Sequence, residues 1–356
     1  MVIYVNAIEL QTYKCYNNKE EVEVVTIKDL SAQTGYSVGT ISRVLNNQPN
    51  VSEKARTTIL EAAAACGFQL NTNAQQLKQQ RSNNILVLVK GSSNQLFSNL
   101  VEAIQSKLHG SAYHLVVDYM DEDSNEVLRA VQLCREKKPM GVLFLGGNRR
   151  HFLADFERID APCVLVTSDG SELPFKNLSS VCSDDKEAVR KVMEELISMG
   201  HRQFAIIGGD PERSDTSRRR LEGCLTALNQ HGISFHKDNY QAVRFSYEEG
   251  YQAAERLLSQ NCSYTAIFCM ADVMAMGAIR ALSDHGRRVP EDVSVVGFDG
   301  LTIGAYMIPR LSTVSQSVSD LAQRSVELLK QAMEGSGAVH QMIPAQVILR
   351  ESVRSI

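Results

Sequence analysis

The sequence predicts a small all-α head followed by a two-lobed α/β body of doubly wound parallel sheets. Short helical patterns occupy residues 25–67, and no strand-like run interrupts them. From residue 85 onward, continuous apolar runs alternate with amphipathic stretches, which is the pattern of parallel strands covered on both faces. Roughly 270 residues of this pattern exceed what one sheet usually organises, so we expect two α/β lobes.

The expected strands and helices of the body follow one another along residues 84–356. The apolar runs that we expect to form strands are residues 85–89, 115–119, 141–145, 163–167, 204–209, 266–270 and 293–299. The stretches that we expect to form helices include residues 124–137, 184–200, 217–231, 247–260 and 272–285.

The composition is typical of a globular protein that stays in the cytoplasm. Of the 356 residues, 44% are hydrophobic and 22% are charged. No apolar run approaches the ~20 residues that a membrane span needs, and the N-terminus lacks the features of a secretory signal. The eight scattered cysteines form no CxxC pair and no zinc pattern, which favours buried thiols in a reducing compartment. We therefore expect no cofactor, no metal and no membrane partner.

The charge is unevenly distributed between the head and the body. The whole chain carries a net charge of −4, which alone gives no sign of a nucleic-acid partner. Residues 25–81, however, hold more basic than acidic groups: Lys28, Arg43, Lys54, Arg56, Lys78 and Arg81 against Asp29, Glu53 and Glu61. This segment is therefore at +3 and the remainder at −7. Such asymmetry is expected of a DNA-binding head on a different module.

The head is predicted to contain three short helices, which span residues 27–34, 37–45 and 53–67. Thr26 and Ser52 are typical N-cap residues, and Ser37 begins the second helix in the same way. Gly35 permits a tight turn between the first two helices. This arrangement predicts a helix-turn-helix. Residues 25–70 are assigned to it, and residues 1–24, which are polar and irregular, are expected to be a disordered extension.

The second helix is expected to enter the major groove of DNA with its N-terminal residues toward the base edges. The candidate base readers are Val38, Gly39, Ser42 and Arg43. The candidate phosphate contacts are Ser37, Thr40, Asn46 and Ser52, and Thr26 is a further DNA-binding candidate. Arg43 can bind a guanine through two hydrogen bonds. The alternative is a purely structural three-helix unit with a solvated arginine.

Residues 26–68, which include the strings TISRVLNN and VSEKAR, resemble the headpiece of the lactose/galactose repressor (LacI/GalR) family of bacterial transcription regulators. The similarity continues through MGHRQFAIIGG, RRLEGCLTAL, ADVMAMGAIRAL, GRRVPEDVSVVGFDG and RLSTVSQSV. It covers roughly residues 25–350. It implies a repressor of metabolic genes that binds a near-palindromic operator as a homodimer and that responds to a small molecule.

The resemblance also assigns residues 71–83 to a hinge helix. In the family, paired hinge helices enter the minor groove, and each inserts a leucine that bends the duplex. Leu77 matches this leucine, and Asn71 and Ala74 match the other DNA-contacting hinge positions. Leu70 stands where many members have proline. The alternative is a flexible linker with one stray leucine.

The body resembles periplasmic sugar-binding proteins, whose ligand lies between two lobes at the carboxyl ends of strands. This rule and the family resemblance together give the candidate effector-binding residues Ser93, Asn94, Phe97, Arg219, Arg220, Phe245, Asp272 and Asp299. Arg220 matches the family's effector-binding arginine, and Phe245 matches its stacking aromatic residue. The alternatives are a solvated basic run at 218–220, a core role for Phe245 and a turn or cap role for Asp299.

Two departures bear on the effector. Ala271 stands where the family often has Asn, and Thr167 stands where many members have Asp. Both remove polar groups typical of sugar binders, so the effector is left open among a sugar, a sugar derivative and a nucleobase-like molecule. No nucleotide-binding glycine motif, HExxH or GxSxG occurs, so catalysis is not expected. A transport solute-binding protein and an α/β enzyme are the two alternative classes.

Overall fold

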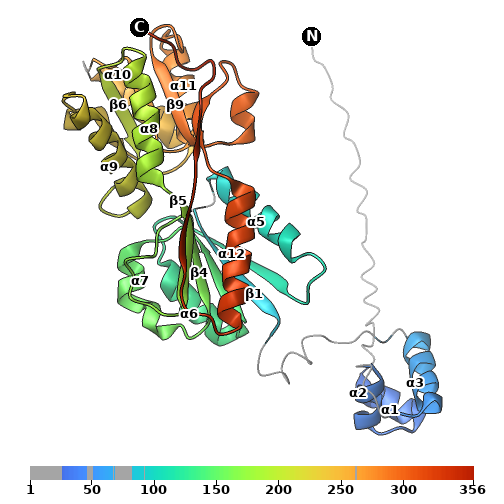
Figure 1. Cartoon of the computed structure of the whole chain (residues 1–356). Coiled ribbons are helices and arrows are strands. Elements are labelled where there is room, and N and C mark those ends of the chain that lie inside the picture. The colour runs from blue at the N-terminus through green and yellow to red at the C-terminus, as the bar shows by residue number, and fades with distance from the viewer. Residues whose placement is uncertain (1–25, 46–50, 67, 69–81, 92, 261–262) are drawn as a thin grey trace, which may run out of the picture. The chain divides into compact units, whose positions relative to one another are not determined.

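The computed structural model describes residues 26–45, 51–66, 68, 82–91, 93–260 and 263–356 (Figure 1). The chain divides into two compact units, Met1–Gln79 and Gln80–Ile356. The first unit is the head and the second is the body. Within the part of the chain that is described, no helix is long and apolar enough to cross a bilayer.

Three helices form the described part of the head: α1 (Ile27–Thr34), α2 (Val38–Leu45) and α3 (Glu53–Ala65). The Thr26 hydroxyl accepts from the backbone N–H of Asp29, and the Asp29 carboxylate accepts from the Thr26 N–H at 2.7 Å, which completes a capping box. Gly35 has φ 73°, the left-handed conformation that ends α1 and turns the chain toward α2. The caps expected from the sequence therefore set the helix starts.

Among the described residues of the head, five buried side chains form one core cluster: Leu30, Ile41, Val44, Ile59 and Ala63. Ile41 and Val44 are three residues apart on α2, and Ile59 and Ala63 are four residues apart on α3, so each pair lies on one face of its helix. The buried face of α2 consists of Ile41 and Val44, so the opposite face of that helix is exposed to solvent.

The body contains two six-stranded sheets, which confirms the predicted two-lobed α/β architecture. The first sheet has the order β11-β5-β4-β3-β1-β2, and its paired strands all run parallel. Its strands are β1 (Asn84–Lys90), β2 (His114–Met120), β3 (Gly141–Leu145), β4 (Cys163–Val166), β5 (Leu178–Ser183) and β11 (His340–Ile343). Its helices are α5 (Gln95–Leu108), α6 (Glu126–Lys137), α7 (Arg149–Asp155) and α12 (Val318–Met333).

The second sheet has the order β12-β10-β9-β8-β6-β7, and only its edge strand β12 pairs antiparallel. Its strands are β6 (Phe204–Gly208), β7 (Tyr240–Ala242), β8 (Ala266–Cys269), β9 (Ser294–Asp299), β10 (Ser312–Ser315) and β12 (Gln346–Ile348). Its helices are α8 (Asp185–Ser198), α9 (Asp215–Gln230), α10 (Tyr247–Ser259) and α11 (Asp272–Asp284).

The chain crosses between the lobes at residue 184, at residues 316–317 and at residues 344–345. As a result, α12 comes late in the sequence but packs against α5 in the first lobe (Figure 1). In each sheet the strand order reverses beside one strand, β1 in the first lobe and β6 in the second. The carboxyl ends of strands at such a reversal are where doubly wound proteins bind ligands.

Candidate functional site

The solvent-facing side of α2 presents the residues that the sequence marked as base readers. Ser37, Gly39 and Arg43 are exposed, and Val38 keeps 42% of its surface accessible although it is apolar. Thr40 and Ser42 are partly buried. An exposed valine in the first turn of α2 and an exposed arginine in its last turn fit a surface that meets a partner.

Gly39 is not required by the packing of the head. A Cβ built at this position meets only the Ser37 hydroxyl, at 3.8 Å. Glycine within a helix costs about 1 kcal/mol relative to alanine. The head therefore keeps a helix-destabilising residue on the exposed face of α2.

The three hydroxyls expected to contact DNA at helix starts already act as caps. The Thr26 hydroxyl accepts from the Asp29 N–H, the Ser37 hydroxyl from the Thr40 N–H at 3.2 Å and the Ser52 hydroxyl from the Ala55 N–H at 3.4 Å. Four candidate DNA contacts lie outside the described residues: Asn46, Asn71, Ala74 and Leu77.

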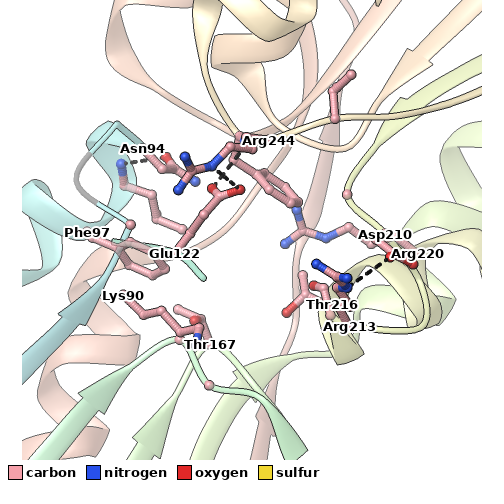
Figure 2. A pocket seen from close by; sticks show the side chains of 18 of the residues that line it. Lys90, Asn94, Phe97, Glu122, Thr167, Asp210, Arg213, Thr216, Arg220 and Arg244 are labelled. Carbon is pink, nitrogen blue, oxygen red and sulfur yellow. Dashed lines mark hydrogen bonds and ion pairs between the residues drawn. The ribbon is translucent and has the colours of Figure 1, made fainter. Parts of the chain in front are cut away.

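A cavity of about 460 Å³ lies between the lobes of the body, at the carboxyl ends of strands from both sheets (Figure 2). The first lobe contributes Lys90, Asn94, Phe97, Glu122, Gly146 and Thr167, among others. The second lobe and the crossing segments contribute Gly209, Arg213, Thr216, Arg220, Arg244, Phe245, Asp299 and Gln316, among others. The volume lies within the range of small-molecule sites.

Arg220 is the electrostatic centre of this cavity. It is 3% exposed, and its Nε donates to Asp185 Oδ2 at 3.0 Å. One Nη also donates to the Met270 carbonyl, and the other lies 3.9 Å from Asp299 Oδ1. The guanidinium carbon lies 3.6 Å from the centroid of the Phe298 ring, which adds a cation–π contact. The arginine is thereby held rigidly.

Asp299 ends strand β9 and joins the two lobes. Its carboxylate accepts from Asn94 Nδ2 at 3.1 Å and from Gln316 Nε2 at 2.8 Å. Burial raises the pKa of Asp299 to about 6, although Arg220 opposes this rise. Asp299 and Thr167 both have positive φ, 116° and 70°, and both line the cavity. Strained backbone of this kind concentrates at ligand sites.

Asp185 was not identified from the sequence because it begins a helix with the ordinary charged run DDKE. The structure buries it behind Arg220, and burial raises its pKa. Its Oδ1 has no hydrogen-bond partner among the described residues. Only the crossing of the chain after β5 brings this carboxylate to the arginine.

Three candidate effector residues, Ser93, Arg219 and Asp272, do not line the cavity. Arg219 pairs with Asp169 and so links α9 to the loop after β4. Asp272 Oδ2 accepts from the Leu301 N–H and Oδ1 accepts from the Thr313 hydroxyl, both at 2.6 Å. Burial raises the pKa of Asp272 to about 8. Asp272 thus supports the loop after β9 from behind.

Two aromatic rings face the cavity, as the sequence indicated. Phe97 lies on α5 and Phe245 follows β7. A Cβ at Gly209 would lie 2.7 Å from the Phe245 ring and 2.6 Å from the Ser217 hydroxyl. Glycine is therefore needed there for the ring to reach its position. Ser93 lies in a neighbouring cavity instead.

The comparisons with known proteins agree with this geometry. Residues 26–71 match the family described as bacterial regulatory proteins, lacI family, and residues 193–353 match the periplasmic binding protein-like domain. The HTH-type transcriptional regulator MalR of Clostridium butyricum is 32% identical over 93% of this chain and 100% of its own length. The probable HTH-type transcriptional repressor ExuR of Bacillus subtilis is 30% identical over 94% and 99%.

Among solved structures, the lac repressor dimer bound to operator and the anti-inducer ONPF superposes with a TM-score of 0.78. It is 27% identical in sequence and covers 93% of this chain and 99% of its own. Both units of the chain are thus matched by regulators over nearly their whole length. The chain therefore belongs to the lacI family of bacterial regulatory proteins, which are transcription regulators with a DNA-binding helix-turn-helix and an effector-binding body.

Proposed function

We propose that the chain is a repressor of metabolic genes that binds a near-palindromic operator as a homodimer. A small molecule in the cavity between the lobes controls this binding. The proposal rests on two features found in one chain. The head, a separate compact unit, exposes one face of α2, and the body contains a polar cavity. Two-fold symmetry of a dimer would be matched by symmetry of the operator.

The effector is proposed to be a polar ring compound: a sugar, a sugar derivative or a nucleobase-like molecule. Asn94, Arg220 and Asp299 offer fixed hydrogen-bonding groups, while Phe97 and Phe245 offer apolar ring faces. Relatives with solved structures include a cellobiose complex of the regulator CelR, 25% identical with a TM-score of 0.68. Thr167 and Ala271 remove two polar groups, which argues for a ligand other than a simple sugar.

The residue boundaries proposed for the parts of the chain rest on the family resemblance. Residues 25–70 would form the DNA-binding head, residues 71–83 the hinge and residues 84–356 the body, with residues 1–24 as an extension. Asn71, Ala74 and Leu77 would contact the minor groove from the hinge. The protein would act in the cytoplasm, where the operator is, and without catalysis, as its relatives are transcription regulators.

A Gly39→Ala variant should change the stability of the head and its affinity for DNA in opposite directions. The added methyl group clashes with nothing in the head, and alanine favours the helix, so the head should gain up to ~1 kcal/mol of stability. The same methyl group would stand between α2 and the DNA. We expect affinity for the operator to fall at least about tenfold, or about 1.4 kcal/mol.

The matched control is Thr58→Ala, which raises helix propensity on the exposed side of α3. Thermal unfolding and titration of operator DNA would be measured on both variants. Unchanged operator affinity in Gly39→Ala, with increased stability, would show that α2 does not approach DNA as proposed.

A further inference from the structure

The cavity that we assign to the effector has a second cavity beside it. This outer cavity measures about 280 Å³, compared with about 460 Å³ for the inner one. The wall between them is formed by the residues that line both: Gly91, Glu122, Arg244, Phe245 and Glu249. The position of these side chains therefore decides whether a ligand can occupy the inner cavity alone or both cavities.

Ion pairs across the lobes hold this wall. Arg244 follows β7 in the second lobe, and the acidic run Asp121–Asp123 follows β2 in the first. Arg244 Nη2 lies 2.5 Å from Asp121 Oδ1 and 3.6 Å from Asp123 Oδ2, and Arg244 Nε lies 3.0 Å from Glu122 Oε1. Figure 2 shows the Arg244 and Glu122 side chains pointing toward one another at the cavity.

Glu122 is the member of this group that is fixed most firmly. Besides Arg244, its carboxylate accepts from the Phe245 N–H at 3.4 Å, and its partial burial raises its pKa. The Arg244 side chain is 47% exposed. An arginine that reaches water can move away, whereas its carboxylate partner stays in the wall. The Arg244–Glu122 ion pair can therefore open through movement of the Arg244 side chain alone.

The outer cavity is strongly acidic. The described residues that line it include four carboxylates, Asp121, Glu122, Glu248 and Glu249, and one arginine, Arg244. If Arg244 moves away, the chamber keeps all of its negative charge. An anionic molecule would then be repelled there, while a neutral or cationic one would be accepted.

We propose that Arg244 and the acidic run Asp121–Asp123 form a gate that sets which effectors enter the inner cavity. With the gate shut, the inner cavity holds a molecule of single-ring size. With the gate open, a neutral or cationic extension of the ligand occupies the outer cavity, and an anionic extension is excluded. This inference rests on the effector-binding role proposed above, and it assigns the size and charge limits of that ligand.

Thiol reagents of graded size and charge test the gate without knowledge of the effector. A cysteine at Thr216→Cys reports on the inner cavity, and one at Ser93→Cys reports on the outer cavity. Small, bulky, cationic and anionic methanethiosulfonates would be applied to the full chain. Each rate would be normalised to the reaction with free cysteine, and the rate of the chain without the added cysteine would be subtracted.

In the Arg244→Ala background, the bulky reagent should modify the Thr216→Cys thiol about fivefold faster, which is about 1 kcal/mol. Ser93→Cys should gain much less, because it already lies on the outer side of the wall. High salt should accelerate the parent, because it screens exposed pairs, but not the variant. Cationic reagents should outpace anionic ones at the inner thiol. The matched control is Arg150→Ala, which breaks another pair between the lobes, Arg150–Glu212, whose two residues line neither cavity.

Equal acceleration by Arg150→Ala and Arg244→Ala would overturn the gate, because it would mean a general loosening of the lobes. Rates that do not depend on reagent size would do the same. An equal gain at both thiols in Arg244→Ala would indicate local unfolding and would also contradict the proposal. Binding of operator DNA by the same variants is measured separately, so failure of the gate is distinguishable from failure of the repressor function.

Discussion

An Arg220→Ala variant is expected to lose about 3–5 kcal/mol of unfolding free energy, because it leaves buried carboxylates without their cation. Asp185 and Asp299 are both buried, and Arg220 is the arginine that contacts them. The variant also loses the contact with the Phe298 ring. The response to effector should disappear with it, since Arg220 lines the cavity.

The measurement is urea unfolding of the full chain followed by circular dichroism, with Arg218→Ala as the matched control. Arg218 lies two residues earlier on the same helix, and its partly exposed side chain pairs with Asp215 and Glu222. Surface pairs of this kind contribute about 0–1 kcal/mol. Equal losses in the two variants would contradict the central role of Arg220.

The loss should also depend on pH. In the folded parent the pKa of Asp299 is already raised to about 6, and Arg220 opposes a further rise. Without the arginine, the folded-state pKa of both carboxyls rises further above the unfolded value. A raised carboxyl pKa contributes stability at low pH that is lost as pH increases through the folded pKa. The deficit of Arg220→Ala should therefore be smaller at pH 5 than at pH 8.

The second large effect is expected from Leu30→Ala in the head. Leu30 is fully buried in the small core of that unit. Removal of a buried leucine side chain beyond Cβ costs about 2–5 kcal/mol, which is comparable to the whole stability of so small a domain. The head should unfold and operator binding should be lost, while the body, a separate compact unit, stays folded.

Leu60→Ala is the control for this change. Leu60 lies on α3 of the same head but is 47% exposed, so its loss should change stability by no more than about 0.5 kcal/mol. Operator titration and the unfolding curve of the body would be recorded for both variants. Operator binding that survives Leu30→Ala would place the DNA contacts outside the head.

The sequence predicted those elements whose local chemistry is sufficient to define them. Thr26, Gly35 and Ser52 set the starts and the turn of the head helices, and the long apolar runs gave the central strands. Strand β5 was not expected because its sequence, LSSVCS, is half polar. The structure pairs its serines with the last strand of the first sheet: the Ser179 hydroxyl accepts from the Val339 N–H, and Ser180 bonds His340. That partner lies 160 residues away, so no local pattern could reveal it.

Only some of the residues that line the cavity could be predicted from the sequence. The rule that ligands bind at the carboxyl ends of strands placed Asn94, Phe97 and Asp299 correctly at its edge. It could not place Asp185 or the Arg244 gate, because these depend on how segments from two lobes meet. The sequence pattern gave no means to separate Asp272, which supports a loop, from residues that face the cavity.

The most direct test of the account is selection of DNA from a random duplex pool by the full chain, followed by titration of the selected sequence over a range of salt. We expect a near-palindromic sequence to be enriched. Its affinity should fall by about 10³-fold or more between 50 and 200 mM salt. Arg43→Ala should relax the preference at one symmetric pair of positions, at a cost of about 1–3 kcal/mol. A pool that shows no enriched sequence, or an enrichment that Leu30→Ala leaves intact, would contradict the claim that this head reads DNA.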